Sequence, residues 1–262
     1  MTDPLPAVEI RDVSASYVER GRRLPVLDGL SLTVGPGELV ALIGPSGSGK
    51  STLLDVVAGL IAPDAGEVLI AGVAWTAAER LGMSAYMRQR DLLLPWRRVG
   101  ANAALALEAA GVGRREARRR ATVQLQRLGL AEFVDAYPAE LSGGMRQRVA
   151  FARTMLAGRP VLLLDEPFGA IDALTRAGLH VGLQVTLESD PRTALLVTHD
   201  VEEAITLADR VVVLSERPAR VTHIESILLP RPRLAGITTY PQAIQHKTRI
   251  LAALGQPAVA SS

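Results

Sequence analysis

The chain has 262 residues, 48% of them hydrophobic, which is enough for one large domain or two small ones with a buried core. It contains no cysteine, so disulfides, thiolate metal sites and cysteine nucleophiles are excluded. The net charge of +2 gives no sign of a nucleic-acid partner, and no apolar run approaches the roughly 18 to 20 residues of a membrane span.

The N-terminal part is predicted to form two strands of an antiparallel sheet. Residues 8–17 alternate between apolar and polar types, which is typical of a half-buried strand that ends near Tyr17. A turn at residues 21–23 leads to a second strand at 26–34, which the Gly-Pro-Gly sequence at 35–37 ends.

A glycine-rich loop follows the apolar run at 39–43 and precedes a helix-like stretch at 52–58. The loop fits the pattern G-x-x-x-x-G-K-[ST] and consists of Gly44, Pro45, Ser46, Gly47, Ser48, Gly49, Lys50 and Ser51. Backbone N–H groups of such a loop surround an anion, and the helix N-terminus adds its positive dipole end. We expect Lys50 to reach the β- and γ-phosphates of a nucleotide and Ser51 to offer its hydroxyl to Mg²⁺.

Lysine is rare in this chain, which makes Lys50 informative. Lysine occurs only at positions 50 and 247, so the 29 basic residues include 29 − 2 = 27 arginines. Arginine cannot replace lysine where a compact charge must fit among phosphates. Lysine at position 50 is therefore interpreted as a chemical requirement of the loop.

The middle of the chain is predicted to alternate strands and helices. Strands are expected at 67–71 and 84–87, with Gln89 just after the second, and residues 99–128 have helical character. The arginines between 114 and 120 are interpreted as a solvated helix face rather than a partner or lipid contact. Ser142 is a good N-cap for a helix that ends near 158–160. Its predicted buried stripe consists of Met145, Val149, Ala152 and Leu156.

Polar residues follow the remaining predicted strands. The continuous apolar run at 161–164, typical of a parallel strand, leads into Asp165 and Glu166, and the strand at 193–198 ends at His199. Helices are expected at 172–188 and 200–208, the second opened by a capping box of Asp200 and Glu203. A last buried strand at 211–214 has a hairpin partner at 220–229. This alternation predicts an α/β fold with a mostly parallel sheet.

These residues could supply the parts that phosphoryl transfer to water requires. Asp165 would hold Mg²⁺ and Glu166 would act as general base on the attacking water, although two acids at a strand end are common in any loop. His199 could donate a hydrogen bond to the γ-phosphate, and Gln89 could reach Mg²⁺ or the water. All four follow strands, at the edge where open α/β sheets bind ligands.

A second possible anion site lies at the predicted helix start formed by Ser142, Gly143 and Gly144. One chain would then carry two phosphate-binding helix N-termini. This suggests a pair of subunits in which each completes the nucleotide site of the other. Tyr17 could stack on an adenine ring or lie in the core.

The complete set of motifs, in order from about residue 8 to 230, resembles the nucleotide-binding subunits of ABC transporters. The resemblance identifies the loop at 44–51 as Walker A, residues 161–166 as Walker B and residues 141–145 as the signature. Gln89, Asp172, His199 and Tyr17 resemble the loop glutamine, the D-loop aspartate, the switch histidine and the adenine-stacking aromatic residue. ATP and Mg²⁺ are the implied cofactors, with Thr52 also at the ATP site.

The resemblance also implies the architecture. It implies a P-loop NTPase (RecA-like) core with a mostly parallel sheet, an antiparallel β subdomain and a helical subdomain at about 90–158, all within a nucleotide-binding domain at 1–230. Residues 231–262 would form a C-terminal tail with one weak helix near 243–254 and a frayed end.

The implied partners are a second copy of the chain and integral-membrane permease subunits. Two copies would form a head-to-tail homodimer that holds ATP between Walker A of one and the signature of the other. The dimer would be peripheral to the plasma membrane at its cytoplasmic face, with a solute-binding protein as an indirect partner. Gln89 and the loop at 92–96 would pass motion to the permease, which gives Leu93, Leu94 and Trp96 a docking role, unless they pack within the helical subdomain.

Residues 93–96, 144–148 and 215–220 resemble importers of the nitrate, sulfonate and taurine type, and importers of thiamine-precursor pyrimidines share these features. The sequence departs from the broad family at Arg88, where Phe or Pro usually precedes the glutamine, and at Met145, where Gln is usual.

Two other functions compete with transport. Non-transport ABC ATPases, acting in DNA repair or on ribosomes, usually carry two nucleotide-binding domains or a long coiled-coil insertion, whereas this chain has one motif set and a compact helical segment. A catalytically silent module is disfavoured because Lys50, Asp165, Glu166 and His199 are all present.

Overall fold

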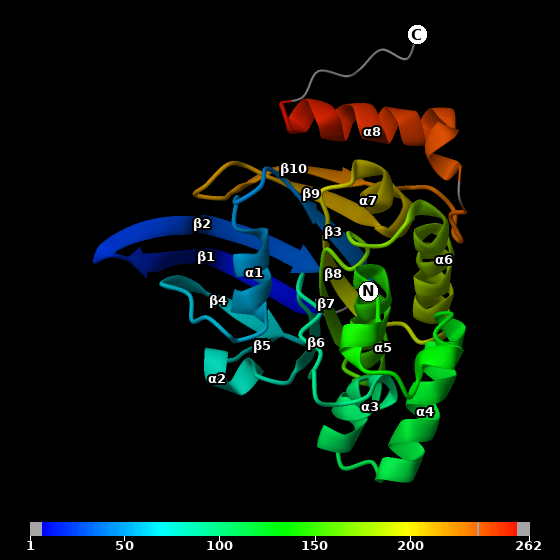
Figure 1. Cartoon of the computed structure of the whole chain (residues 1–262). Coiled ribbons are helices and arrows are strands. Elements are labelled where there is room, and N and C mark those ends of the chain that lie inside the picture. Colours follow the sequence, from blue (N-terminus) through cyan, green and yellow to red (C-terminus); the bar gives the residue numbers. More distant parts are fainter. Residues whose placement is uncertain (1–6, 235, 256–262) are drawn as a thin grey trace.

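The described part of the chain forms two β-sheets with flanking helices (Figure 1). The structure is a computed structural model that describes residues 7–234 and 236–255. The start of the predicted domain, 1–6, and the frayed end predicted for the tail, 256–262, lie outside the described residues. Within 7–234 and 236–255, no helix combines the length and the apolar character needed to cross a membrane.

The larger sheet has six strands in the order β10-β9-β3-β8-β7-β6, and β10 alone runs antiparallel to its neighbour. The strands are β3 (Leu39–Ile43), β6 (Ser84–Met87), β7 (Val161–Asp165), β8 (Thr193–Val197), β9 (Arg210–Leu214) and β10 (Val221–Ser226). Alternate residues face two different cores: Val40 and Leu42 lie in one, and Leu39, Ala41 and Ile43 in the other. Burial on both faces explains why the central strands β3, β7 and β8 consist almost entirely of apolar residues.

The smaller sheet is antiparallel, as predicted, with the order β2-β1-β4-β5. Its strands are β1 (Val8–Glu19), β2 (Arg22–Val34), β4 (Ala65–Ile70) and β5 (Val73–Ala74). The turn between β1 and β2 is tighter than predicted, because Arg20 and Gly21 both have positive φ and β2 begins at Arg22. Helix α1 (Lys50–Val57) places Leu53, Leu54, Val56 and Val57 in the core that both sheets share.

Three helices form a bundle at one end of the molecule, and α2 (Ala77–Arg80) lies beside the smaller sheet (Figure 1). The bundle consists of α3 (Val99–Ala109), α4 (Arg114–Arg127) and α5 (Gly143–Leu156), with short 3-10 turns at Ala131–Phe133 and Pro138–Glu140. The helical stretch predicted at 99–128 is two helices, because the chain turns at Gly111, whose φ is 83°. Of the predicted stripe on α5, Val149 and Ala152 are fully buried, whereas Met145 and Leu156 are only partly buried.

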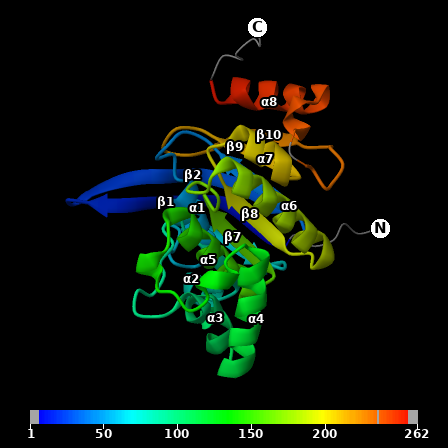
Figure 2. The ribbon, with the colours of Figure 1, turned by 45° about the vertical axis from the view of Figure 1, so that its right-hand side comes forward.

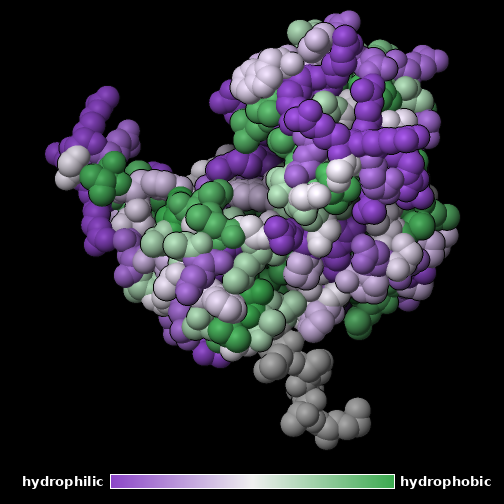
Figure 3. Space-filling model, turned by 90° about the horizontal axis from the view of Figure 1, so that it is seen from below, coloured by the Kyte–Doolittle hydropathy of each residue, from purple (hydrophilic) through white to green (hydrophobic). Residues whose placement is uncertain are grey.

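The arginine-rich segment is a solvated face of α4, as predicted. Arg119 and Arg120 pair with Glu116 on the same helix, and Arg118 pairs with Asp135. Figure 3 shows this end of the molecule, with hydrophilic side chains on the side where Figure 1 places α4 and hydrophobic ones toward α2.

The remaining helices are α6 (Ala173–Ser189), α7 (Val201–Leu207) and α8 (Pro241–Ala253), with a 3-10 turn at Ile237–Thr239. Helix α8 lies at the end opposite α3 and α4 in both ribbon views (Figures 1 and 2). It begins two residues earlier than predicted and buries Ala243 and Ile250.

Helix α8 is held to two elements of the domain. The Lys247 ammonium donates a 2.6 Å hydrogen bond to Glu202 on α7. The buried carboxylate of Glu225 on β10 lies 2.6 Å from Nδ1 of His246 and accepts a hydrogen bond from Arg249 at 2.9 Å. The helix predicted near 243–254 is therefore packed against the rest of the molecule.

The capping box predicted at the start of α7 is only half present. Asp200 accepts hydrogen bonds from the backbone N–H groups of Glu202 at 2.8 Å and Glu203 at 3.1 Å, so it caps the helix. The Glu203 carboxylate does not return to Asp200 but lies 2.9 Å from Nε2 of His180 on α6. The Glu203 carboxylate therefore pairs with a residue of another helix instead of the N-terminus of its own helix.

Candidate active site

The carboxyl ends of β3, β6, β7, β8 and β9 meet at one edge of the larger sheet, where a pocket of about 380 Å³ opens. The residues that the sequence assigns to the site and that line this pocket are Tyr17, Ser46, Gly47, Gly49, Lys50, Ser51, Thr52, Gln89, Glu166 and His199. The parallel strands therefore bring together predicted side chains from four separate parts of the chain, and Tyr17 reaches the pocket from β1 of the smaller sheet.

The glycine loop forms the floor of the pocket. Gly49 has a φ of 110°, and a Cβ there would lie 2.8 Å from Cγ1 of Val26, so both its backbone and its surroundings require glycine. The Lys50 ammonium is folded back into the loop, where it donates to the carbonyl oxygens of Gly44 at 2.9 Å and Pro45 at 2.8 Å and lies 3.3 Å from the Ser48 hydroxyl.

Lys50 is a buried cation whose hydrogen-bond partners, among the described residues, are neutral oxygens. Its exposed fraction is 8%, and burial lowers the pKa of Lys50, while the nearby charges of Glu166 and Asp165 oppose that shift. A buried ammonium beside backbone N–H groups at a helix start fits an anionic ligand, which would supply the charge that the loop lacks.

Asp165 is the last residue of β7 and Glu166 is the first residue after it, and the two side chains have different surroundings. Asp165 is buried, which raises its pKa, and the Ser51 hydroxyl beside it acts in the opposite direction. Glu166 has a φ of 48°, in the left-handed region, and its N–H donates to the carbonyl of Val197 on β8 at 2.9 Å. The chain thus turns sharply after Asp165, and the Glu166 side chain reaches the pocket.

The Glu166 carboxylate is the meeting point of two other predicted site residues. Nε2 of Gln89 donates to Glu166 Oε2 at 3.1 Å, and Nδ1 of His199 lies 3.4 Å from Oε1. Three residues predicted separately from three strand ends therefore form one cluster, which is placed beside the pocket floor.

Tyr17 and Thr52 lie together at the rim. The Tyr17 hydroxyl is 3.2 Å from Oγ1 of Thr52, and Tyr17 is 42% exposed. Of the two places that the sequence left open for Tyr17, the structure supports the pocket rim rather than the core.

The other predicted site residues lie outside the pocket lining. Ser142 caps α5 by accepting from the N–H of Met145 at 3.3 Å, and both Ser142 and Gly143 are exposed. A Cβ on Gly144 would lie 3.0 Å from the carbonyl of Ala170, so this helix start packs closely against the loop before α6. Asp172 caps α6, and its hydrogen bond from Thr175 holds the pKa of Asp172 below its usual range.

Two residues near the pocket have no place in the sequence prediction. Gln147 on α5 is buried and donates from Nε2 to the backbone carbonyl of Glu166 at 2.9 Å. The signal for it was a polar residue on the inner side of a helix, because a buried amide needs a partner. Arg217 is exposed and lines the pocket from the loop after β9. In the sequence, this loop only showed similarity to a subfamily of importers and did not indicate a site residue.

The loop expected to dock on a membrane partner is split between core and surface. Leu93 is buried in the main core, Leu94 is half-buried and Trp96 is 72% exposed. Of the two roles that the sequence left open for Leu93, the structure supports packing rather than docking, since its side chain lies inside the molecule. Trp96 keeps an exposed apolar surface.

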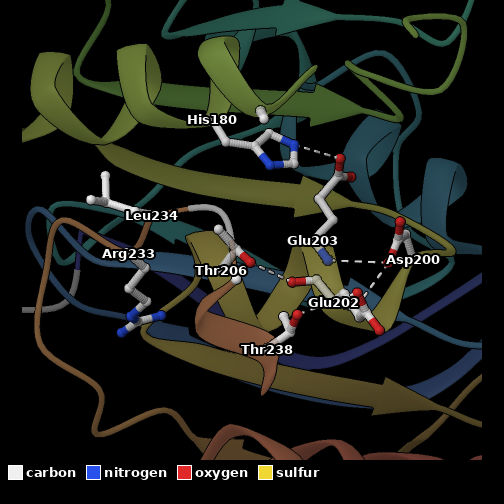
Figure 4. Close-up of a pocket in the computed structure, with 10 residues that line it drawn as sticks. His180, Asp200, Glu202, Glu203, Thr206, Arg233, Leu234 and Thr238 are labelled. Carbon is white, nitrogen blue, oxygen red and sulfur yellow. Dashed lines mark hydrogen bonds and ion pairs between the residues drawn. The ribbon is translucent and has the colours of Figure 1, made fainter. Parts of the chain in front are cut away.

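A second, smaller cavity of about 170 Å³ lies between α6, α7 and the segment after β10 (Figure 4). His180 and Glu203 pair across it, and the Thr206 hydroxyl donates to the carbonyl of Glu202 at 2.7 Å. Buried Arg233 donates to the carbonyls of Ile205 and Ala208 at the end of α7. These bonds fasten α7 in place, so we assign the cavity a structural role. Among the described residues, no group of three or more His, Asp or Glu side chains could hold a metal ion.

Comparison with known proteins agrees with this geometry. A family model described as ABC transporter matches residues 27–169. The chain is 48% identical over 221 residues to the aliphatic sulfonates import ATP-binding protein SsuB 1 of Rhodococcus jostii, covering 83% of each chain. It is 39% identical over 254 residues to the taurine import ATP-binding protein TauB of Pseudomonas savastanoi pv. phaseolicola, covering 94% of this chain and 95% of that one.

A solved structure supports the same assignment. The dimeric post-hydrolysis state of an ATP-binding cassette bound to ADP and Pi matches with a TM-score of 0.76 and 29% identity, covering 85% of this chain and all of that one. Both the sequence and the fold lead to one conclusion: the chain belongs to the ABC transporter family, as one of its ATP-hydrolysing subunits.

Proposed function

We propose that the chain drives an ABC importer for a small anionic or organic solute of the nitrate, sulfonate and taurine class. The observation that carries the ATPase part is the cluster in which Gln89 and His199 hold the Glu166 carboxylate beside the buried Lys50 ammonium. The similarity to sulfonate and taurine import proteins supports the solute class. An importer of a thiamine-precursor pyrimidine would use the same ATP site and is the alternative.

The donor set at the pocket floor fits ATP with Mg²⁺. Lys50 offers an ammonium, the glycine loop offers N–H groups, and Ser51, Gln89 and Asp165, which is buried beside Ser51, offer the oxygen ligands that Mg²⁺ prefers. When bound, Mg²⁺ would neutralise charge on the phosphates. Tyr17 at the rim would stack on the base.

Glu166 would act as the general base. Its carboxylate would accept a proton from the attacking water, and Gln89 would orient that water, while His199 would donate a hydrogen bond to the terminal phosphate. The left-handed backbone at Glu166 places the side chain at the pocket.

The nucleotide site of a second copy of the chain would be completed by four residues of this one: Ser142, Gly143, Gly144 and Asp172. They lie outside this chain's own pocket, and Ser142 and Gly143 are exposed at the start of α5. A helix N-terminus favours an anion, so an exposed one can serve a nucleotide held by another subunit. The likeness to a cassette solved as a dimer supports the pairing of two copies.

Permease subunits would bind near Trp96, whose side chain is exposed between β6 and α3. The chain would then lie at the cytoplasmic face of the plasma membrane as a peripheral subunit, with a solute-binding protein as an indirect partner. An exposed tryptophan beside the segment that carries Gln89 supports a docking role there.

The test is transport in vesicles that contain the chain and its permease subunits, with ATP supplied and nitrate, taurine, an alkanesulfonate and a thiamine-precursor pyrimidine offered in turn. Uptake of one of the first three that stops with Glu166→Gln is the expected result. Uptake of the pyrimidine alone would favour the alternative, and ATP hydrolysis without uptake of any of them would contradict the proposed solute class.

A further inference from the structure

We propose that Arg88 is a positioning residue, and that its ion pair with Asp55 holds Gln89 at the nucleotide site. The proposal rests on the proposed function, because it concerns how Gln89 is kept beside Glu166. Arg88 directly precedes Gln89, so an anchor on the first residue limits the movement of the second.

The contact joins two parts of the site that are far apart in the sequence. Nη2 of Arg88 lies 2.9 Å from each carboxylate oxygen of Asp55 on α1. The Arg88 guanidinium also lies over the Tyr86 ring, 5.1 Å from its centroid. The ion pair with the carboxylate and the contact with the ring together fix the Arg88 side chain in one orientation.

Asp55 makes this pair more than a surface contact. Its side chain is only 10% exposed, on a helix whose neighbouring residues Leu53, Leu54, Val56 and Val57 are buried in the apolar core. A carboxylate in such surroundings needs a cation. Among the described residues, Arg88 is the cation with which Asp55 forms an ion pair.

Arg88 lies just after the end of β6, where the hydrogen bonds of the sheet no longer fix the backbone. The ladder between β6 and β7 ends with Met87 opposite Leu164, so Arg88 and Gln89 lie beyond its last pair. Gln89 is exposed, yet its amide donates to Glu166 at 3.1 Å. The side-chain pair of Arg88 therefore supplies an anchor immediately before Gln89.

The ion pair between Arg88 and Asp55 also connects Gln89 to the phosphate-binding loop. Helix α1 begins with Lys50 and Ser51, and Asp55 lies one turn after Ser51. A displacement of α1 would reach Arg88 through the ion pair, and Gln89 through the adjoining peptide. The ion pair thus connects the floor of the pocket to the residue that contacts Glu166.

The experiment compares Arg88→Met in the normal chain and in a Gln89→Ala background, in single-turnover and steady-state ATPase assays. We expect R88M to lower kcat by about ten- to a hundredfold with KM for ATP unchanged, since small misplacements cost this much. In the Q89A background R88M should have no further effect. R88K, which keeps the cation, should retain most of kcat.

Arg118→Met is the matched control, because Arg118 pairs with Asp135 on an exposed surface, and it should leave kcat unchanged. Asp55→Asn, which breaks the same pair from the other side, replaces R88M if that variant fails to fold. An unchanged kcat in both, or an equal loss with and without Gln89, would overturn the proposal.

Hydrogen exchange gives a readout that needs no ATP. In the nucleotide-free protein, R88M should speed exchange of the amides at 88–91 relative to R118M. If R88M speeds this exchange but the wild-type chain does not hydrolyse ATP, the proposed function fails and the link between Arg88 and Asp55 stands. Unchanged exchange in R88M would overturn the link.

Discussion

The side-chain amide of Gln147 donates a 2.9 Å hydrogen bond to the backbone carbonyl of Glu166, whose φ of 48° lies in the left-handed region. A non-glycine residue in such a conformation costs about 1–3 kcal/mol and persists only where its surroundings hold it. Helix α5, which starts at the signature residues, therefore supports the backbone that aims the proposed base.

Replacing Gln147 with Leu should both destabilise the protein and impair catalysis. The variant removes the 2.9 Å hydrogen bond from Gln147 and leaves the Glu166 carbonyl with the 3.3 Å hydrogen bond from the N–H of Gly169, and the loss of one hydrogen bond costs about 0.5–1.5 kcal/mol. Urea unfolding and kcat measure the two effects. Gln126→Leu, at an exposed position on α4, is the control. A Q147L variant with normal kcat would show that Glu166 needs no support from α5.

Replacing Glu166 with Gln should lower ATP turnover by about 10²–10⁴-fold, as the loss of a general base does. The amide keeps the shape of the side chain, so ATP should still bind and the ATP-bound dimer should persist. Turnover, nucleotide binding and size-exclusion chromatography check these outcomes, with exposed Glu188→Gln as the control. Normal turnover in E166Q would exclude the base role.

Local signals predicted most of the fold. The apolar runs at 39–43, 161–164 and 193–198 predicted strands, and the unbroken run at 161–164 indicated a parallel strand, because strands buried on both faces need apolar residues throughout. Ser142 predicted a helix start because an N-cap depends on its own helix alone. The break at Gly111 also had a local signal, which the prediction of one helical stretch at 99–128 did not use.

Contacts between residues far apart in the chain could not be predicted from local sequence patterns. Glu203 had the right spacing for a capping box, but His180 on another helix binds it instead. Gln147 reaches Glu166 across 19 positions, and nothing in either local pattern indicates the partner. An apolar loop does not reveal which side chain turns inward, so Leu93 and Trp96 could not be told apart.

Replacing Lys50 with Ala should weaken ATP binding itself, because the ammonium is the cation at the pocket floor. Calorimetric titration with a non-hydrolysable ATP analogue measures the affinity. The chain's other lysine gives a matched control: Lys247→Ala, which removes a contact to Glu202 on α7, should leave affinity unchanged. Equal affinities for K50A and the wild type would remove Lys50 from the proposed phosphate site.

Trp96 and Leu93 should respond in opposite ways, because one is 72% exposed and the other is buried. Trp96→Glu should leave the unfolding free energy and the basal ATPase unchanged but abolish uptake in vesicles that contain the permease. Leu93→Ala should instead lower the unfolding free energy by about 2–5 kcal/mol, as removal of a buried leucine side chain does. Urea unfolding and vesicle uptake, measured on both variants, separate the two roles. Normal uptake with W96E would show that the permease docks elsewhere.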